Sequence, residues 1–276
     1  MNQRQAEHDR YFRVRRSGAG APLVAFYEAA IVAYHRLLRE ILDGYSLTPI
    51  ELGHLRGALE GILFRLQPPD RSAATSRARS PVPIVAVPPV GQVDVLRRWV
   101  RGHHVFFILI QALLLAHEWL SRAMHVAQPS GVHAMLDWAT ELWWAAGAAF
   151  RFAGDFDQRL YATIVRPSMC PPYLSEGFSG LHSVDHAELM GLLKAARPTI
   201  DDRRLMHPAA HRSYLWALSS VYDSHVYVCE EFVNQGPSLK GNASSKYLSS
   251  AVAVLGGPLK QRAMTNAGAP PLFEED

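Results

Sequence analysis

Residues 104–126 have the sequence HVFFILIQALLLAHEWLSRAMHV, in which Gln111 is the one polar side chain between Val105 and Ala116. This stretch contains the longest apolar run of the chain and predicts a long helix over about residues 93–126. A transmembrane helix needs about 20 consecutive apolar residues, so the run is too short to cross a bilayer. The N-terminal residues also contain no apolar segment typical of a signal peptide. We therefore expect a soluble, cytoplasmic protein with no membrane partner.

Helical patterns continue on both sides of this segment. Between residues 23 and 42 apolar side chains recur at three- and four-residue intervals, and Gly44 ends the predicted helix. Thr48 and Pro49 fit an N-cap followed by proline at the first helical position, so a second helix is predicted to run to about Leu66. Further helices are predicted over about residues 132–153, 182–196, 210–234 and 247–255.

A proline-rich stretch over residues 67–92, which contains six prolines, separates the first helices from the rest of the chain. It predicts a surface connection, with a mobile flap as the alternative. Pro198 is expected to end the helix over residues 182–196. No segment shows a convincing strand pattern. The predicted fold class is all-α, with an N-terminal helical segment and linker (1–92) packed on a helical domain (93–276).

The composition excludes several classes of protein. The chain has 276 residues, of which 49% are hydrophobic, so a sizeable core is expected and a wholly disordered chain is excluded. Two cysteines are too few for a disulfide scaffold. A net charge of +3 is too small to indicate a nucleic-acid partner, and none is expected. Thirteen histidines beside two cysteines are the unusual feature.

His225 and Cys229 lie four residues apart in SHVYVCEEF (224–232), a spacing that places them one turn apart on the same face of a helix. The pair fits metal ligands, a catalytic dyad, or two core side chains. A zinc site normally has four ligands, and Cys170, the other cysteine, lies in no comparable pair. Apolar surroundings would also raise the pKa of the thiol. The spacing alone therefore favours core packing.

Three segments in order are similar to the tryptophan 2,3-dioxygenase superfamily. HVYVCEEFVNQGPSLKGNASSKYL (225–248) resembles the helix with the proximal heme-ligand histidine, the Gly/Ser-rich loop over the substrate, and the start of the next helix. GFSGLHSVDH (177–186) resembles the segment that faces the substrate. HVFFILIQALLLAHEW (104–119) resembles the distal-side helix. This resemblance implies an all-α, tryptophan 2,3-dioxygenase-like bundle that encloses a heme.

One departure points to a sibling group, the 3-methyl-L-tyrosine hydroxylases. Their signature is a histidine, about 38 intervening residues, and then His-x-x-x-Cys. Here His186 precedes His225 by 38 intervening residues, and Cys229 completes the pattern. The resemblance implies a c-type heme with a single thioether to Cys229 and iron ligated by His225, without a CxxCH motif.

The resemblance also implies catalytic residues on the distal side. His186 is the first candidate for moving protons at an iron-bound peroxide. His117 is the second, and its alternative is a hydrogen-bonded core histidine. Ile110 aligns with the distal histidine of tryptophan dioxygenases, a departure that favours hydroxylation over dioxygenation.

A zwitterionic aromatic substrate needs apolar walls and groups for its carboxylate and ammonium. Aromatic side chains suit the ring, and a lysine suits the carboxylate. The loop side chains have solvated surface positions as their alternative. The expected substrate-binding residues are Phe178, Ser179, Lys240, Asn242, Ser244 and Tyr247.

The expected function is therefore a heme-dependent monooxygenase or peroxygenase, with hydrogen peroxide or O2 as oxidant. It would hydroxylate the ring of L-tyrosine or 3-methyl-L-tyrosine in the biosynthesis of tetrahydroisoquinoline-type antibiotics. The alternatives are a tryptophan-directed heme oxygenase of the same superfamily, a non-catalytic heme sensor, and a helical scaffold without heme. The resemblance also implies a homo-oligomer, a dimer or tetramer.

Overall fold

The computed structural model describes residues 3–17, 22–66, 94–126, 129–178, 183–202 and 208–233. Every regular element within these ranges is helical, which confirms the all-α prediction. In chain order the elements are α1 (Gln3–Tyr11), α2 (Pro22–Leu42), α3 (Pro49–Arg65), α4 (Val95–His125), α5 (Pro129–Ala153), α6 (Gln158–Leu160), the π-helical turn η2 (Tyr161–Val165), α7 (Arg166–Ser168), α8 (Val184–Asp202) and α9 (Pro208–Val233).

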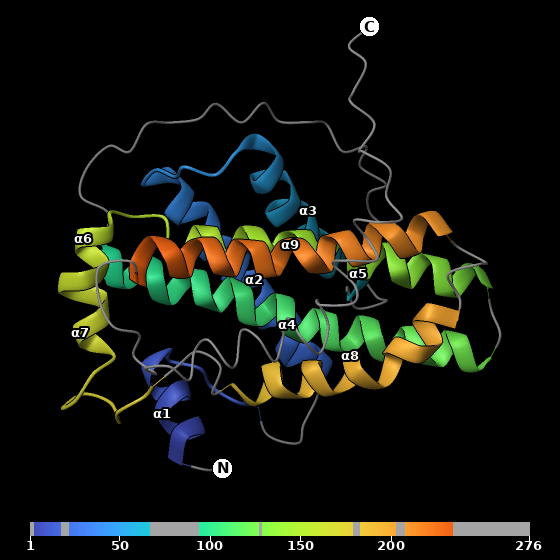
Figure 1. The fold of residues 1–276 in the computed structure, drawn as a ribbon, viewed down its shortest axis with the longest axis horizontal. Coiled ribbons are helices and arrows are strands. Elements are labelled where there is room, and N and C mark those ends of the chain that lie inside the picture. Colours follow the sequence, from blue (N-terminus) through green and yellow to red (C-terminus); the bar gives the residue numbers. More distant parts are fainter. Residues whose placement is uncertain are drawn as a thin grey trace, which may run out of the picture.

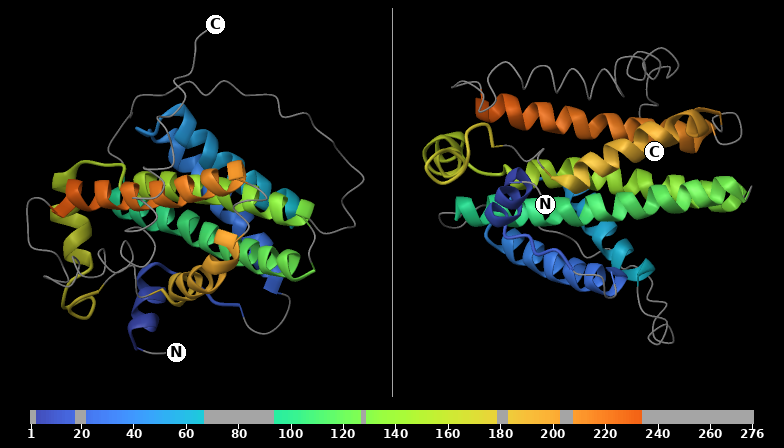
Figure 2. Two further views of the ribbon diagram at one scale, coloured as in Figure 1. Left: turned by 45° about the vertical axis from the view of Figure 1, so that its right-hand side comes forward. Right: turned by 90° about the horizontal axis from the view of Figure 1, so that it is seen from below.

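Helices α4 and α5 form the centre of the bundle (Figure 1). Helix α9 packs along α5, α8 packs on α4, and α2 and α3 pack on α4 and α5 from the opposite side. The right-hand view of Figure 2 shows α9 and α2 on opposite sides of the central pair. The turns α6, η2 and α7 form a cap at one end.

One hydrophobic core joins the N-terminal helices to the rest. Leu37 of α2 and Leu59 of α3 are buried in the same cluster as Leu109 of α4 and Leu142 of α5. The tryptophans of α5 also belong to this core, because Trp138 is 1% exposed. The described helices of the first 92 residues are therefore part of the bundle core.

Sequence signals at the helix ends match the structure. Thr48 forms a capping box with Glu51, in which its hydroxyl accepts from the Glu51 N–H at 3.3 Å. Asp94 caps α4, accepting from the Arg97 N–H at 3.0 Å. Gly44 has φ +106°, a conformation that glycine adopts without steric cost.

Three details of the structure differ from the sequence expectations. Helix α1 has no apolar periodicity and was not predicted. Pro198 lies inside α8, so its prediction as a helix end is wrong; one proline removes a single backbone donor, and α8 continues only to Asp202. The short turn α7, over Arg166–Ser168, lies where no helix was predicted. The helix predicted over 247–255 and the linker over 67–92 lie outside the described residues.

Helix α4 is also long and apolar enough to cross a membrane by length and composition alone. In this fold it is the central helix, and 56% of its most apolar window is buried inside the protein. Such a window is typical of a core helix as well, so the cytoplasmic location stays a prediction.

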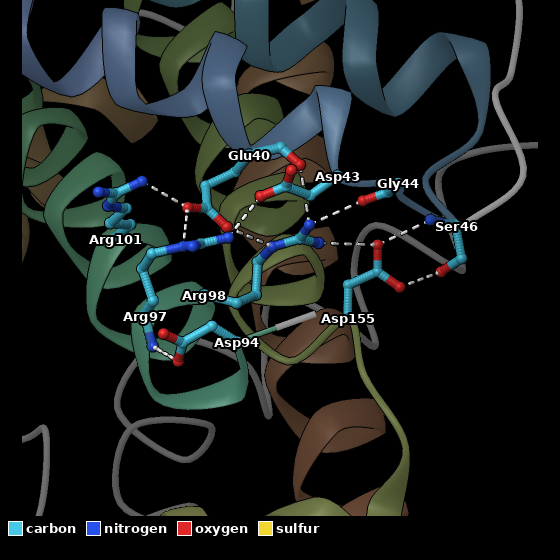
Figure 3. Close-up of polar contacts among 9 residues, drawn as sticks. All are labelled: Glu40, Asp43, Gly44, Ser46, Asp94, Arg97, Arg98, Arg101 and Asp155. Carbon is cyan, nitrogen blue, oxygen red and sulfur yellow. Dashed lines mark hydrogen bonds and ion pairs between the residues drawn. The ribbon is translucent and has the colours of Figure 1, made fainter. Parts of the chain in front are cut away.

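A buried ion pair connects α2, α4 and the end of α5 (Figure 3). The side chains of Arg98 and Glu40 are both 0% exposed, and Arg98 Nε donates to Glu40 Oε2 at 3.2 Å. Arg98 Nη2 donates to the carbonyls of Glu40 and Gly44 at 2.9 and 2.7 Å. Its Nη1 lies 3.6 Å from Asp155 Oδ2, and Asp155 also accepts from the Ser46 N–H at 2.7 Å. A single guanidinium therefore holds three chain segments.

We expect Arg98→Met to lower the free energy of unfolding by about 3 kcal/mol, because Oε2 of buried Glu40 and two carbonyls would lose the donors that Arg98 supplies. The matched control is Arg97→Met, which removes the neighbouring arginine. Arg97 also binds Glu40 but its side chain is 37% exposed, so we expect a loss below about 1 kcal/mol. Urea unfolding measures both values, and equal losses would contradict the central role of Arg98.

Gly102 permits the close approach of α4 and α5. A Cβ at this position would lie 2.5 Å from Ala153 Cα and 2.6 Å from Ala153 Cβ. We expect Gly102→Ala to lower the free energy of unfolding by about 1–3 kcal/mol, because backbone must move. Gly53→Ala is the control: nothing lies within 4 Å of that Cβ, so a gain of up to about 1 kcal/mol is expected. A stabilised Gly102→Ala variant would refute this explanation.

Candidate functional site

His225 lies on α9 where this helix packs closely on α5. A Cβ at Gly147 of α5 would lie 3.1 Å from Ser224 Oγ, so the absence of a side chain at Gly147 permits this approach. The His225 ring contacts Phe150 of α5 edge-on, with centroids 5.2 Å apart. Burial lowers the pKa of His225. Its imidazole is therefore neutral near pH 7, the form that ligates iron.

His186 lies in the first turn of α8 and is close enough to His225 for their charges to interact. Burial, and then the neighbouring His225, lower the pKa of His186. Two nearby imidazoles cannot both be protonated without repulsion. The structure thus brings together the two histidines that the sequence spacing singled out, one on each helix. Burial favours the neutral form of both imidazoles, the form that can bind iron or accept a proton.

Helix α1 and the residues that follow it hold the N-terminus of α8. Arg16 binds Asp185, the residue before His186, through two bonds of 2.9 and 3.0 Å. The same guanidinium binds Asp9 at 2.7 and 3.1 Å. Gln5 Oε1 accepts from the Val184 N–H at 2.8 Å. These contacts fix the turn that carries His186.

The sequence alone does not reveal this cluster on α1. Arg16 and Asp185 are 169 positions apart, and local patterns contain no information on such a pairing. The available signal was weak: a short helix on which the polar residues Gln5, His8 and Asp9 are the buried ones.

Aromatic side chains hold the C-terminal end of α9. Phe232 stacks on Tyr161 of η2 with centroids 4.3 Å apart, and on Phe156 at 5.4 Å. A Cβ at Gly154 would lie 2.8 Å from the Phe232 ring. Cys229 lies on this part of α9, one turn after His225, but its side chain is outside the described residues.

His117 is a hydrogen-bonded core residue, which was the alternative interpretation of this position. It is 2% exposed, its Nδ1–H donates to the Leu113 carbonyl at 2.7 Å, and its Nε2 accepts from the Tyr214 hydroxyl at 2.8 Å. Both ring nitrogens bind the protein. This placement does not favour a catalytic role.

Phe178 is the one predicted substrate residue among those described. It is 2% exposed and contacts Tyr11 edge-on, with centroids 5.2 Å apart, in a cluster with Phe12 and Phe232. The other predicted substrate residues lie outside the described residues: Ser179, Lys240, Asn242, Ser244 and Tyr247.

The residues present suit a heme better than a metal held by several side chains. Among the described residues, no group of three or more His, Cys, Asp or Glu could hold a metal ion. A heme iron needs one imidazole from the protein, and neutral, half-buried His225 meets that need. The α9 backbone also places Cys229 one turn after His225, on the same face of the helix.

The buried histidines predict a loss of stability in acid, most clearly for His117. Burial lowers the pKa of His117 to about 4 from about 6.5, so the unfolded state binds more protons between these pH values. The contribution of His117 to the free energy of unfolding is fully present above pH 6.5. It falls as pH decreases toward 4, by up to about 3 kcal/mol.

We expect His117→Gln to flatten this part of the pH dependence, measured as the free energy of unfolding from pH 7 to pH 4. The control His35→Gln changes an exposed histidine of α2 and should leave the curve unchanged. A wild-type slope in His117→Gln would contradict the buried neutral state.

Comparisons with known proteins identify the family. Residues 1–213 match the family described as SfmD 3-methyl-L-tyrosine peroxygenase, a match that ends before His225 and Cys229. A 3-methyl-L-tyrosine peroxygenase from Streptomyces lavendulae is 35% identical over 248 residues, which cover 88% of this chain and 65% of that protein. The chain thus spans just under two thirds of this relative's length.

A solved structure confirms the helical fold. The crystal structure of reduced SfmD, obtained by soaking with sodium hydrosulfite, is 28% identical with a TM-score of 0.65. The similarity covers 82% of this chain and 74% of that one. The family match includes the N-terminal helices, for which sequence analysis found no resemblance. The chain therefore belongs to the SfmD 3-methyl-L-tyrosine peroxygenase family.

Proposed function

We propose that this chain is a heme-dependent peroxygenase that hydroxylates the aromatic ring of 3-methyl-L-tyrosine or L-tyrosine, in natural-product biosynthesis. Family membership supports the reaction class and the substrate class. The observation that carries the proposal at the site is the proximity of His186 and His225, both held neutral by burial. In this proposal His225 holds the iron, and Cys229 forms the thioether that retains the heme.

The heme, when bound, would supply the redox chemistry for splitting hydrogen peroxide. In the overall reaction one peroxide oxygen enters an aromatic C–H bond to give C–OH, and the other leaves as water. His186 would accept a proton from one oxygen of the peroxide and return it to the oxygen that leaves as water. Its lowered pKa provides the unprotonated nitrogen that this role needs.

The Arg16 bridge serves this step by fixing His186. Two bonds to Asp185 hold the first turn of α8, so the His186 backbone cannot shift without breaking an ion pair. Phe178 lies in the segment that resembles the one facing the substrate. Its ring, buried beside Tyr11, provides an apolar wall for an aromatic ring.

The decisive test combines spectroscopy, mass and turnover. We expect purified protein to have a Soret band and a denatured mass one heme above that of the chain. His225→Ala should lose most of the heme. Cys229→Ala should bind heme that acidified organic solvent extracts, and Cys170→Ala is its matched control, which should retain covalent heme. With peroxide and 3-methyl-L-tyrosine, the product should gain the mass of one oxygen.

Other results would favour the alternatives. Turnover of tryptophan in place of tyrosines would favour a tryptophan-directed oxygenase, and a Soret band without turnover would favour a sensor. Protein purified from cells supplied with iron and heme precursor, but without a Soret band, would refute the proposal. A His186→Gln variant that binds heme normally should lose most turnover, about 100-fold or more.

A further inference from the structure

His8 on α1 is a buried histidine to which the proposed function gives no role. It is 1% exposed, and its Nδ1 lies 3.2 Å from Asp9 Oδ1. Its Nε2 has no hydrogen-bond partner within the described part of the chain. Buried polar atoms in folded proteins nearly always have a partner, so an exception needs an explanation.

The neighbouring residues determine which form of the imidazole is present. Burial lowers the pKa of His8 despite the hydrogen bond to Asp9, so the ring is neutral near pH 7. Although burial opposes it, hydrogen bonds from Arg16 and His8 lower the pKa of Asp9, so Asp9 is a carboxylate. An ionised carboxylate only accepts hydrogen bonds. The His8 proton therefore lies on Nδ1, and Nε2 presents a bare lone pair that needs a donor.

The surroundings of His8 are aromatic and include Phe178, one of the predicted substrate-binding residues. Its ring centroid lies 4.9 Å from that of Phe12, 5.3 Å from Phe107 and 6.5 Å from Phe178. Phe107 belongs to α4, the helix that resembles the distal side, and Phe178 to the segment that resembles the substrate-facing one. A ligand placed between these segments would meet aromatic faces and one nitrogen acceptor.

The Asp9 carboxylate also connects His8 to the turn that carries His186. Arg16 bridges Asp9 and Asp185, and the charge of Asp185 interacts with His8. The ion pair that fixes His186 therefore also fixes the orientation of the His8 ring. The Arg16 bridge therefore constrains two neutral histidines: His8, next to Asp9, and His186, next to Asp185.

We propose that His8 Nε2 accepts a hydrogen bond from the hydroxyl of a phenolic ligand, with Asp9 holding the ring in the acceptor tautomer. The choice of a tyrosine as this ligand rests on the proposed function. A buried acceptor favours ligands that carry a donor, because a ligand without one leaves the lone pair unsatisfied. His8 thereby selects a phenol over an unsubstituted phenyl ring.

Calorimetric titration of the purified full-length holoprotein tests this selection without turnover. Wild type should bind L-tyrosine about tenfold more tightly than L-phenylalanine, the ratio that one hydrogen bond of about 1.4 kcal/mol provides. O-methyl-L-tyrosine has no hydroxyl donor, so it should also bind about tenfold more weakly than L-tyrosine. A wild type that does not distinguish the three ligands overturns the proposal, whatever the variants do.

Variants then assign the selection to His8. His8→Phe should bring the ratio of tyrosine to phenylalanine affinity below about two, while His8→Gln, which retains an acceptor, should keep part of it. The control His35→Phe changes an exposed histidine of α2 and should keep the full ratio. A full ratio in folded His8→Phe would mean that a group other than His8 selects the phenol, and would overturn the proposal.

The same data distinguish this inference from the proposed function. Failure of the peroxygenase proposal appears as missing heme or missing oxygenated product. Failure of the His8 proposal appears as equal affinities for the three ligands in wild type, or as an unchanged ratio in His8→Phe; both are measured without peroxide. If His8→Phe does not fold, His8→Gln and the three-ligand comparison on wild type still decide the result.

Discussion

The Arg98–Glu40 ion pair is the interaction on which the arrangement of helices depends. Removing two charges from water costs several kcal/mol per ion, and only good geometry with further hydrogen bonds offsets it. Arg98 supplies that geometry by donating to Glu40 and to two carbonyls at the end of α2, while Asp155 faces its other nitrogen (Figure 3). Because a guanidinium is rigid and planar, this contact sets the register of α4 against α2.

That register carries the constraint to the candidate site. Six residues after Arg98, His104 accepts from Arg36 of α2 at 2.8 Å and donates to the Phe12 carbonyl at 2.5 Å. The end of α1 is thereby fixed to α4. Arg16 then bridges Asp9 and Asp185. The position of His186 on α8 thus follows, contact by contact, from the packing of α2 on α4.

The sequence predicted the helices that have an apolar stripe and the caps that use local chemistry. The helices around residues 23–42 and 93–126 and the N-cap at Thr48 are local features, and all three are present in the structure. Helix α1 was missed because its stabilising contacts involve residues distant in sequence. The proximity of His186 and His225 could be inferred from spacing only with the help of a resemblance, because 38 intervening residues do not define a distance.

The number of hydrogen bonds that each imidazole makes within the protein distinguishes histidines that stabilise the fold from those suited to bind a ligand. A neutral imidazole has one donor and one acceptor. His117 uses both on the protein, with Leu113 and Tyr214, so a ligand could reach it only by breaking a buried bond. His8 uses its donor on Asp9, and its acceptor has no partner within the described residues. Similar burial therefore has opposite consequences. Buried His117 stabilises the core through two hydrogen bonds. Buried His8 has an unsatisfied acceptor, and a hydroxyl-bearing ligand would remove the free-energy cost of leaving it without a donor.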